Sequence, residues 1–205
     1  MADLIFYTNP MSRGQIVRWM LEEFGEPYQE VLLDYGTTMK APEFLAINPM
    51  GKVPTIRHGD AVVTEVAAIC AYLADAFPQA GLAPPPAERA DYYRWLFFAA
   101  GPVESAVTAR AFGLEVPADK AASAGYGSYD ATIGTLEKAV TRRHFLVGNR
   151  FSAADVYVGS QIDWGLQFGT MPKRPAFEAY VAPLRERPAY RKAKVRDHAL
   201  MPPRA

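Results

Sequence analysis

The sequence predicts a mixed α/β domain followed by an all-helical domain. Up to Phe77, short apolar runs rich in β-forming residues alternate with stretches of helical periodicity. Three consecutive prolines, Pro84-Pro85-Pro86, then form a stiff connector. Beyond the prolines the periodic stretches have helical spacing, and no convincing strand follows. We therefore expect a first domain at 1–78, a linker at 79–87 and a helical domain at 88–205.

The first domain is expected to run in the order βαβ, then ββα. A helix at 14–24 has apolar residues on one face and is stopped by Gly25. With the strands on either side it makes a βαβ unit, for which a right-handed crossover is expected. The other expected elements are strands at 4–7, 28–33, 55–57 and 61–63, a short helix opened by Pro42, and a helix at 64–77.

The second domain is expected to contain five helices. The first spans 88–112, and the second spans 118–142 with glycines at 125, 127 and 134 that weaken it. Ser152 followed by Asp155 is the pattern of a capping box at the start of a third, nearly all-apolar helix. Two shorter helices are expected at 174–187 and 188–196.

Composition and charge exclude several kinds of protein. Of the 205 residues, 50% are hydrophobic, which is enough for a sizeable core. Lys+Arg and Asp+Glu both number 22 and are interspersed, so no basic face for nucleic acid or acidic lipid is expected. No apolar run approaches the roughly 18 residues that span a bilayer, and the N-terminus lacks the pattern of an export signal. The expectation is a soluble cytoplasmic protein without a membrane partner.

The sequence contains no recognised motif for metal, nucleotide or dithiol chemistry. The single cysteine, Cys70, excludes a disulfide within the chain and fits a reducing compartment. The histidines at 58, 144 and 198 lack ligand spacing, so no metal is expected. Motifs for dinucleotides, P-loops, zinc proteases, serine hydrolases and CxxC pairs are absent.

The loop 48–56 is the most distinctive stretch of the first domain. Two prolines and a glycine in Asn48-Pro49-Met50-Gly51-Lys52-Val53-Pro54 exclude a helix. Pro54 forces Val53 into an extended conformation, which turns the Val53 N–H and C=O sideways. Such a pair of main-chain groups can hold a peptide-like ligand as an added strand. On this stretch alone, an ordinary strand-entry turn is the simpler interpretation.

Together these features resemble the cytosolic glutathione transferases, in a bacterial form with a serine-type active site. The resemblance covers almost the whole chain and depends on the order and spacing of its motifs. It implies a thioredoxin-like first domain, a helical second domain, and glutathione as co-substrate without a metal. The motifs are the Asn48–Pro54 loop, Thr64-Glu65-Val66-Ala67-Ala68-Ile69 with Tyr72-Leu73, and the Ser152 to Asp155 capping box.

The resemblance implies a set of glutathione contacts in the first domain. The main chain of Val53, before a cis Pro54, would pair with the cysteinyl part of glutathione. Glu65 and Val66 would receive the γ-glutamyl end at a helix N-terminus. The family usually has serine where this chain has Val66, so we expect weaker glutathione binding. Lys40 and Lys52 resemble the cations near the glycine carboxylate, with solvated surface lysines as the alternative.

Three residues are candidates for activating the sulfur. Ser12 resembles the family's serine, which donates a hydrogen bond to the thiolate; alternatively it is a helix N-cap. Tyr7 is a rival donor that we expect to pack in the core instead. Arg13 could add positive potential near the sulfur or simply lie on the surface. No cysteine lies near Ser12, which disfavours glutathione-dependent disulfide reduction.

The implied function is conjugation of the glutathione thiolate to electrophilic hydrophobic molecules, in detoxification, by a homodimer. The alternative is a non-catalytic module of the same fold that carries ligands or binds a partner protein. Aromatic residues on the helices of the second domain are candidates to line the hydrophobic substrate pocket, although such stripes are more often core. These residues are Tyr92, Phe98, Trp164 and Phe168.

Overall fold

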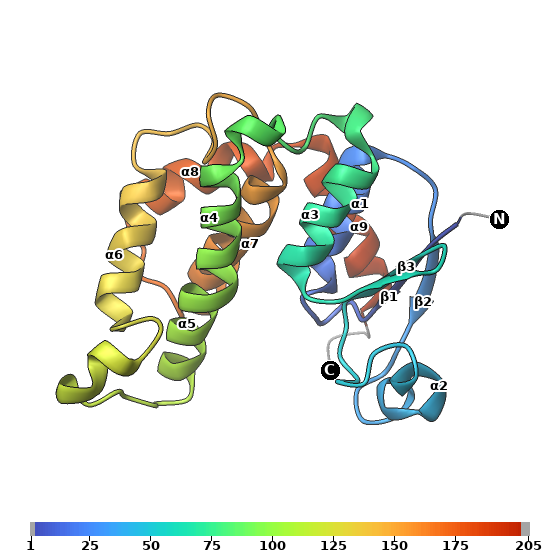
Figure 1. The fold of residues 1–205 in the computed structure, drawn as a ribbon, viewed down its shortest axis with the longest axis horizontal. Helices are drawn as coiled ribbons and strands as arrows, with labels where there is room; N and C mark the ends of the chain where they lie inside the picture. The colour runs from blue at the N-terminus through green and yellow to red at the C-terminus, as the bar shows by residue number, and fades with distance from the viewer. Residues whose placement is uncertain (1–2, 202–205) are drawn as a thin grey trace. The chain divides into compact units, whose positions relative to one another are not determined.

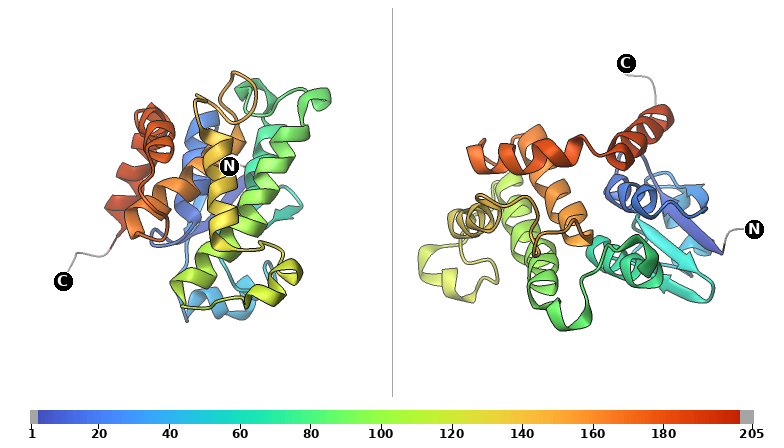
Figure 2. Two further views of the ribbon diagram at one scale, coloured as in Figure 1. Left: turned by 90° about the vertical axis from the view of Figure 1, so that its left-hand side faces the viewer. Right: turned by 90° about the horizontal axis from the view of Figure 1, so that it is seen from above.

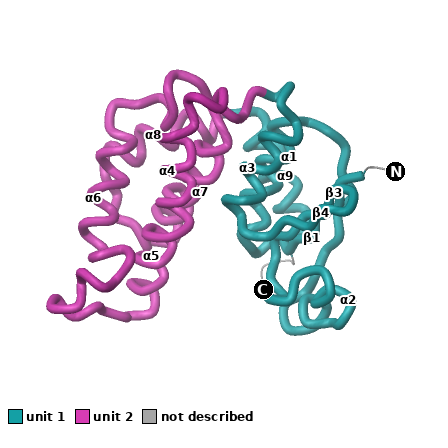
Figure 3. Tube along the Cα trace, in the orientation of Figure 1, with its two compact units in different colours: residues 1–80, 187–205 teal, residues 81–186 magenta. Residues whose placement is uncertain are grey.

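The computed structural model describes residues 3–201 as two compact units. One unit contains residues 3–80 together with 187–201, and the other contains residues 81–186 (Figure 3). The last helix therefore belongs to the same unit as the N-terminal sheet. The sequence had assigned that stretch to the helical domain.

The first unit is built on a four-stranded sheet of order β2-β1-β3-β4 (Figure 1). β1 pairs in parallel with β2, and β3 is antiparallel to both β1 and β4. This mixed sheet with its helices has the predicted βαβ-ββα order and is a thioredoxin-like fold. The elements are β1 Leu4–Thr8, α1 Gly14–Phe24, β2 Gln29–Leu32, η1 Thr38–Lys40, α2 Pro42–Leu45, β3 Thr55–His58, β4 Ala61–Val63, α3 Val66–Ala76 and the turn η2 Pro78–Ala80.

Successive residues of β1 supply the two faces of the sheet, as strand geometry requires. Phe6 is fully buried, and its ring lies 5.5 Å from the guanidinium of Arg18 on α1. On the opposite face, Tyr7 joins Met39 and Phe44 in a buried cluster. One face of the sheet is thus covered by α1, and the opposite face is covered by the η1–α2 segment.

Helix α9, Pro188–Leu200, lies along α1 and is held there by charged groups (Figure 2). Arg18 is fully buried and contacts Asp197 at 2.6 Å and Glu30 at 2.7 Å. Burial opposes the charge of Arg18, but the hydrogen bonds and charges of Glu30 and Asp197 outweigh it and raise the pKa of the guanidinium. Arg187 adds a two-point contact to Glu23 at 2.6 and 2.7 Å. These contacts explain why the chain from 187 onward packs with the first unit.

The second unit is helical, as predicted, but its first long helix is interrupted. The expected helix 88–112 is divided into α4 Ala90–Phe98, the π-helical turn η4 Ala99–Val103 and α5 Glu104–Ala111. Pro102 lies in the turn and has no N–H for the helical ladder, which explains the interruption. A 3₁₀ turn, η3 Pro86–Glu88, precedes α4.

The expected helix 118–142 is also shorter than predicted. Its first part is the 3₁₀ segment η5 Ala118–Ser123, and α6 spans Tyr129–Val140. Gly127 has φ +64°, a conformation that ends helices, and Ser128 then caps α6 by accepting a bond from the Ala131 N–H at 3.2 Å. The turn at Gly127 therefore separates two segments that the pattern had joined, whereas Gly134 lies inside α6 and does not interrupt it.

The predicted capping box begins α7, Ala153–Phe168. The Asp155 carboxylate is buried and accepts bonds from Ser152 N at 2.9 Å, Leu146 N at 2.8 Å and the Tyr180 hydroxyl at 2.7 Å. Burial raises the pKa of Asp155, although these hydrogen bonds oppose the shift. The network joins α7 to α8, Pro175–Arg185.

Candidate active site

The loops with the predicted glutathione-binding residues leave the sheet at one edge. β1 ends where β3 begins, since Tyr7 lies opposite Thr55 in the antiparallel register. β4 ends beside the same point, since Val63 lies opposite Ile56. The turn after β1, the loop before β3 and the start of α3 therefore meet at this edge.

Val53 precedes β3 and is followed by a cis peptide bond to Pro54. Within residues 3–201, neither main-chain group of Val53 takes part in a hydrogen bond. The loop around it is firmly held, because the Asn48 side chain donates to Lys52 O at 2.9 Å and to Thr55 Oγ1 at 3.0 Å. A pair of main-chain groups on a fixed loop is what an added peptide strand requires.

Lys40 stabilises the loop before β3 through hydrogen bonds to its main chain. Its ammonium donates to Met50 O at 3.1 Å and to Gly51 O at 3.0 Å. Gly51 has φ +55°, and a Cβ there would lie 2.7 Å from Met39 O, so the loop requires glycine at this position. Lys52 is exposed at the same loop. The charge of Lys40 is therefore used in part to stabilise the loop conformation.

Glu65 and Val66 form the start of α3. The first main-chain bond of the helix runs from Ile69 N to Glu65 O at 2.8 Å, so the N–H groups of 66–68 have no partner within the helix. Glu65 has φ +63°, which is uncommon for a residue other than glycine, and its exposed side chain forms no capping bond. The helix start thus offers N–H groups and the positive end of the dipole to an anion.

Ser12 lies in the turn before α1 and is 7% exposed. Its hydroxyl donates to Asn9 O at 2.7 Å and accepts a bond from Gly14 N at 2.9 Å. The residue at the N-cap position of α1 is Arg13, and its side chain makes no capping bond. Gly14 packs against Thr8, and a Cβ on residue 14 would clash with the Thr8 hydroxyl. The Ser12 oxygen is therefore fixed at the edge where the loops meet.

Tyr7 and Arg13, the other candidates for activating the glutathione sulfur, and the single cysteine have different environments from that of Ser12. Tyr7 is 8% exposed and packs its ring 5.5 Å from that of Phe44, as the sequence analysis expected. Arg13 is exposed. Cys70 is buried inside α3, and burial raises the pKa of its thiol to about 12, so it is a core residue without nucleophilic character.

Two residues that the sequence analysis did not single out hold the Ser12 turn in place. Asn9 donates from its side chain to Leu33 O at 2.8 Å and accepts from Met11 N at 2.9 Å. Gln15 donates to Pro10 O at 2.7 Å. An Asn-Pro pair favours a turn, but no local pattern in the sequence indicates these longer contacts.

The aromatic candidates of the second unit differ in exposure. Tyr92 is 0% exposed and belongs to the core. Phe98 is half-buried and packs edge-on against Trp95. Trp164 is half-buried, and Phe168 is 67% exposed, with their ring centres 6.0 Å apart on α7. The last three can therefore contact a ligand, whereas Tyr92 is enclosed.

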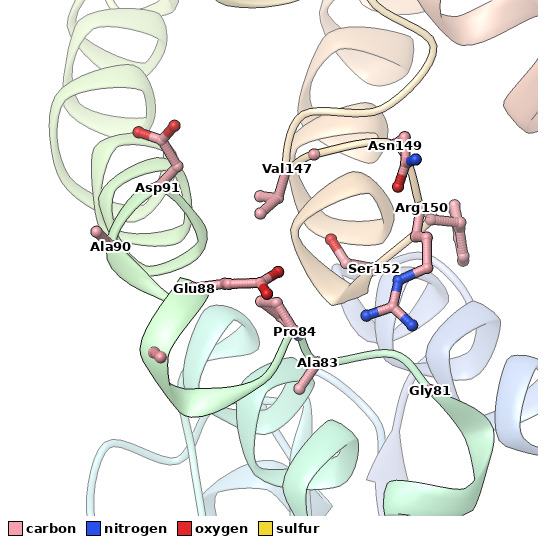
Figure 4. Close-up of a pocket in the computed structure, with 13 residues that line it drawn as sticks. Gly81, Ala83, Pro84, Glu88, Ala90, Asp91, Val147, Asn149, Arg150 and Ser152 are labelled. Carbon is pink, nitrogen blue, oxygen red and sulfur yellow. The ribbon is translucent and has the colours of Figure 1, made fainter.

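The second unit also has a cavity of about 350 Å³ between the connector and the loop before α7 (Figure 4). Glu88 and Asp91 line it on one side, and Asn149 and Arg150 line it on the other. A larger hollow of about 720 Å³ lies between the end of α5 and the start of α6. None of the predicted site residues lines either of these cavities.

Neither metal clusters nor membrane spans occur in the described part of the chain. Among residues 3–201, no three His, Cys, Asp or Glu side chains come together in a way that could hold a metal ion. No helix in this range has both the length and the apolar character needed to cross a membrane.

The fold and the loop edge define a thioredoxin-like domain with a helical partner domain. Residues 11–76 match the model of the glutathione S-transferase N-terminal domain, and residues 109–188 match that of the C-terminal domain. Glutathione S-transferase GstB of Escherichia coli is 31% identical over 183 residues, which cover 84% of this chain and 88% of GstB. The chain belongs to the glutathione S-transferase family and is a glutathione transferase.

Solved structures agree with this assignment. A glutathione S-transferase from Xylella fastidiosa superposes with a TM-score of 0.78 at 25% identity, covering 95% of this chain and 98% of the other. A sphingomonad glutathione S-transferase complexed with glutathione gives a TM-score of 0.76 at 26% identity, with the same coverage of 95% and 98%.

Proposed function

We propose that the protein conjugates the glutathione thiolate to electrophilic hydrophobic small molecules, with glutathione bound at the loop edge of the first unit. The single observation that carries the proposal is the meeting of Val53, the α3 start and Ser12 at that edge. The sphingomonad relative was solved with glutathione, which supports this ligand. The alternative, a non-catalytic module, is not favoured, because the relatives are glutathione transferases.

Each part of glutathione has a matching group. The Val53 main chain pairs with the cysteinyl unit, and Glu65 with the N–H groups of the α3 start receives the γ-glutamyl ammonium and carboxylate. Lys52, and in part Lys40, attract the glycine carboxylate. Val66 offers only its main-chain N–H, so one hydrogen bond worth about 0.5–1.5 kcal/mol is missing relative to a serine.

Ser12 is the proposed catalytic donor, and its environment allows this role. Rotation about the Cβ–Oγ bond redirects the hydroxyl hydrogen from Asn9 O to a sulfur without moving the oxygen, so the bond from Gly14 N is kept. A hydrogen bond to the thiolate lowers the pKa of the glutathione thiol from about 8.5 and so raises the thiolate fraction at neutral pH. Tyr7 is the less suitable donor because its ring is packed against Phe44.

The electrophile is proposed to contact the aromatic side chains of the second unit. Phe98, Trp164 and Phe168 have exposed or half-buried rings suited to an apolar molecule. Bringing two bound reactants together lowers the barrier to conjugation by several kcal/mol through proximity. Tyr92 is fully buried and is therefore not among the residues proposed to contact the electrophile.

Calorimetry with matched variants tests the glutathione site. Wild-type protein should bind glutathione, and Glu65→Ala should weaken binding about tenfold by removing a charged partner, roughly 1.4 kcal/mol. Glu43→Ala removes another exposed acid of the same unit and should leave the affinity unchanged. Turnover with chlorodinitrobenzene then tests conjugation. Absence of glutathione binding by the wild-type protein would refute the proposal.

A cytoplasmic homodimer acting in detoxification completes the proposal. Tyr93 and Phe97 lie one turn apart on α4 and are 41% and 71% exposed, which suits a surface covered by a second copy. Sedimentation should give a dimer for the wild type and a shift toward monomer for Phe97→Asp. A wild-type monomer at micromolar concentration would contradict the dimer.

A further inference from the structure

Helix α9 reaches the Ser12 turn through a chain of two hydrogen bonds. The Lys194 ammonium donates to Gln15 Oε1 at 2.8 Å, and Gln15 Nε2 donates to Pro10 O at 2.7 Å. Gln15 is half-buried in the first turn of α1, three residues after Ser12. A residue near the C-terminus of the chain is thereby connected to the main chain of the proposed catalytic turn.

The chemistry of the three groups fixes the orientation of the Gln15 amide. An ammonium can only donate and a main-chain carbonyl can only accept, so the amide oxygen must face Lys194 and the amide nitrogen must face Pro10. The bond from Lys194 is charge-assisted, which makes this arrangement stronger than a pair of neutral bonds. Lys194 therefore holds Gln15 in the orientation in which it donates to the turn.

The Pro10 carbonyl is adjacent to the atoms that place the serine. Asn9 O accepts both Ser12 N at 3.1 Å and Ser12 Oγ at 2.7 Å, and the Asn9 side chain is tied to the end of β2. Asn9 thus anchors one side of the turn to the sheet, and Gln15 anchors the Pro10 peptide to α1. The position of the Ser12 oxygen depends on both anchors.

We propose that Gln15, oriented by Lys194, is a positioning residue that sets the Ser12 hydroxyl for donation to the glutathione sulfur. This inference rests on the proposed role of Ser12. Its consequence is that α9, which comes from the far end of the chain, contributes to thiol activation. Gln15 itself need not touch glutathione.

Docking of α9 does not depend on Lys194 alone. The hydrogen bond between Lys194 and Gln15 can therefore be removed by mutation without detaching the helix from α1. Lys192 contacts Glu22 of α1 at 2.6 Å, and Arg196 contacts the same carboxylate at 2.7 Å. Asp197 is bound to the buried Arg18. Lys192→Met is therefore a matched control, since it removes an equivalent α9–α1 contact that is not connected to the turn.

The experiment measures turnover, glutathione affinity and the pKa of the bound thiol by ultraviolet absorbance. Gln15→Met and Lys194→Met should each lower kcat about three- to tenfold, the equivalent of one lost hydrogen bond, and should shift the thiol pKa upward. Their Kd for glutathione should stay within about twofold of wild type, because no binding group is removed. Lys194→Arg, which keeps the positive charge, should retain the wild-type kcat that Lys194→Met loses. Lys192→Met should have the kcat and thiol pKa of the wild type.

A double-mutant cycle separates this inference from the proposed function. Ser12→Ala alone tests the role of the serine, and adding Gln15→Met to it should cause no further loss if Gln15 acts through Ser12. The positioning role is overturned if Gln15→Met matches wild type, if the two losses multiply, or if Lys192→Met reproduces Lys194→Met. If Ser12→Ala retains full turnover, the role of the serine fails first, and the role of Gln15 fails with it.

Discussion

The starts of α7 and α1 each have a serine, and the two serines are used differently. Ser152 is the N-cap of α7, and its hydroxyl lies 3.0 Å from the buried Asp155 carboxylate. Ser12 lies one residue before the cap of α1 and bonds only to main-chain groups. The Ser152 hydroxyl is enclosed in a buried polar network. The Ser12 hydroxyl instead donates to the Asn9 carbonyl in the turn after β1, at the edge where the three loops meet.

The difference shows that serine before a helix does not identify a function by itself. A serine with an acid three residues later, in a buried setting, is a structural cap. Ser12 has no acid three residues later, and the role proposed for it is donation to a ligand.

Removal of the Asp155 carboxylate should give the largest effect, on stability. Asp155→Ala leaves the Ser152 and Leu146 N–H groups and the Tyr180 hydroxyl without their acceptor. Each buried donor left unsatisfied costs about 1–3 kcal/mol, so we expect a loss of about 3–5 kcal/mol. Urea unfolding measures it. The exposed Asp119→Ala should change the free energy of unfolding by less than about 0.5 kcal/mol, and an equal loss there would contradict the interpretation.

Ser12→Ala should affect turnover more than stability. A hydrogen bond to a charged group is worth about 1.5–3 kcal/mol, so kcat should fall about ten- to a hundredfold. The pKa of the bound thiol should rise toward about 8.5, which moves the rising limb of the pH–rate profile to higher pH. Steady-state kinetics over a pH series measure both. An unchanged profile would move thiol activation to Tyr7 or to main-chain donors.

Ser152→Ala should give the opposite result. Loss of the cap should cost about 1–2 kcal/mol of unfolding free energy while kcat and KM remain unchanged. Ser128→Ala at the exposed start of α6 is the comparison, and its cost should be smaller because water replaces the lost bond. A fall in turnover for the folded Ser152 variant would remove the distinction between the two serines.

A serine introduced at the start of α3 should give the smallest effect. Val66→Ser adds a hydroxyl where the γ-glutamyl carboxylate is expected, and one added bond of about 0.5–1.5 kcal/mol tightens glutathione binding about two- to tenfold. Val66→Ala controls for the change in size and should leave the affinity unchanged. Calorimetry distinguishes the two. Equal affinities for both variants would place the carboxylate elsewhere.

Much of the first unit could be predicted from the sequence because its signals are local. Gly25 at the end of α1 and Pro42 at the start of α2 each act within one turn of the backbone, and so does the Ser152–Asp155 box in the second unit. The extended conformation at Val53-Pro54 and the succession of strands and helices along the chain likewise follow from neighbouring residues. These features also carried the resemblance on which the proposed glutathione site rests.

The order of the elements along the chain, the loop chemistry and the position of the serine follow from the sequence, because they depend on neighbouring residues. The packing of α9, the contacts of Lys40 and the contacts that hold the Ser12 turn depend on the tertiary fold. Gln15 and Lys194 are 179 positions apart, and no periodic pattern connects them. Such contacts exist because the fold buries Arg18 between β2 and α9, and this brings the two ends of the chain together.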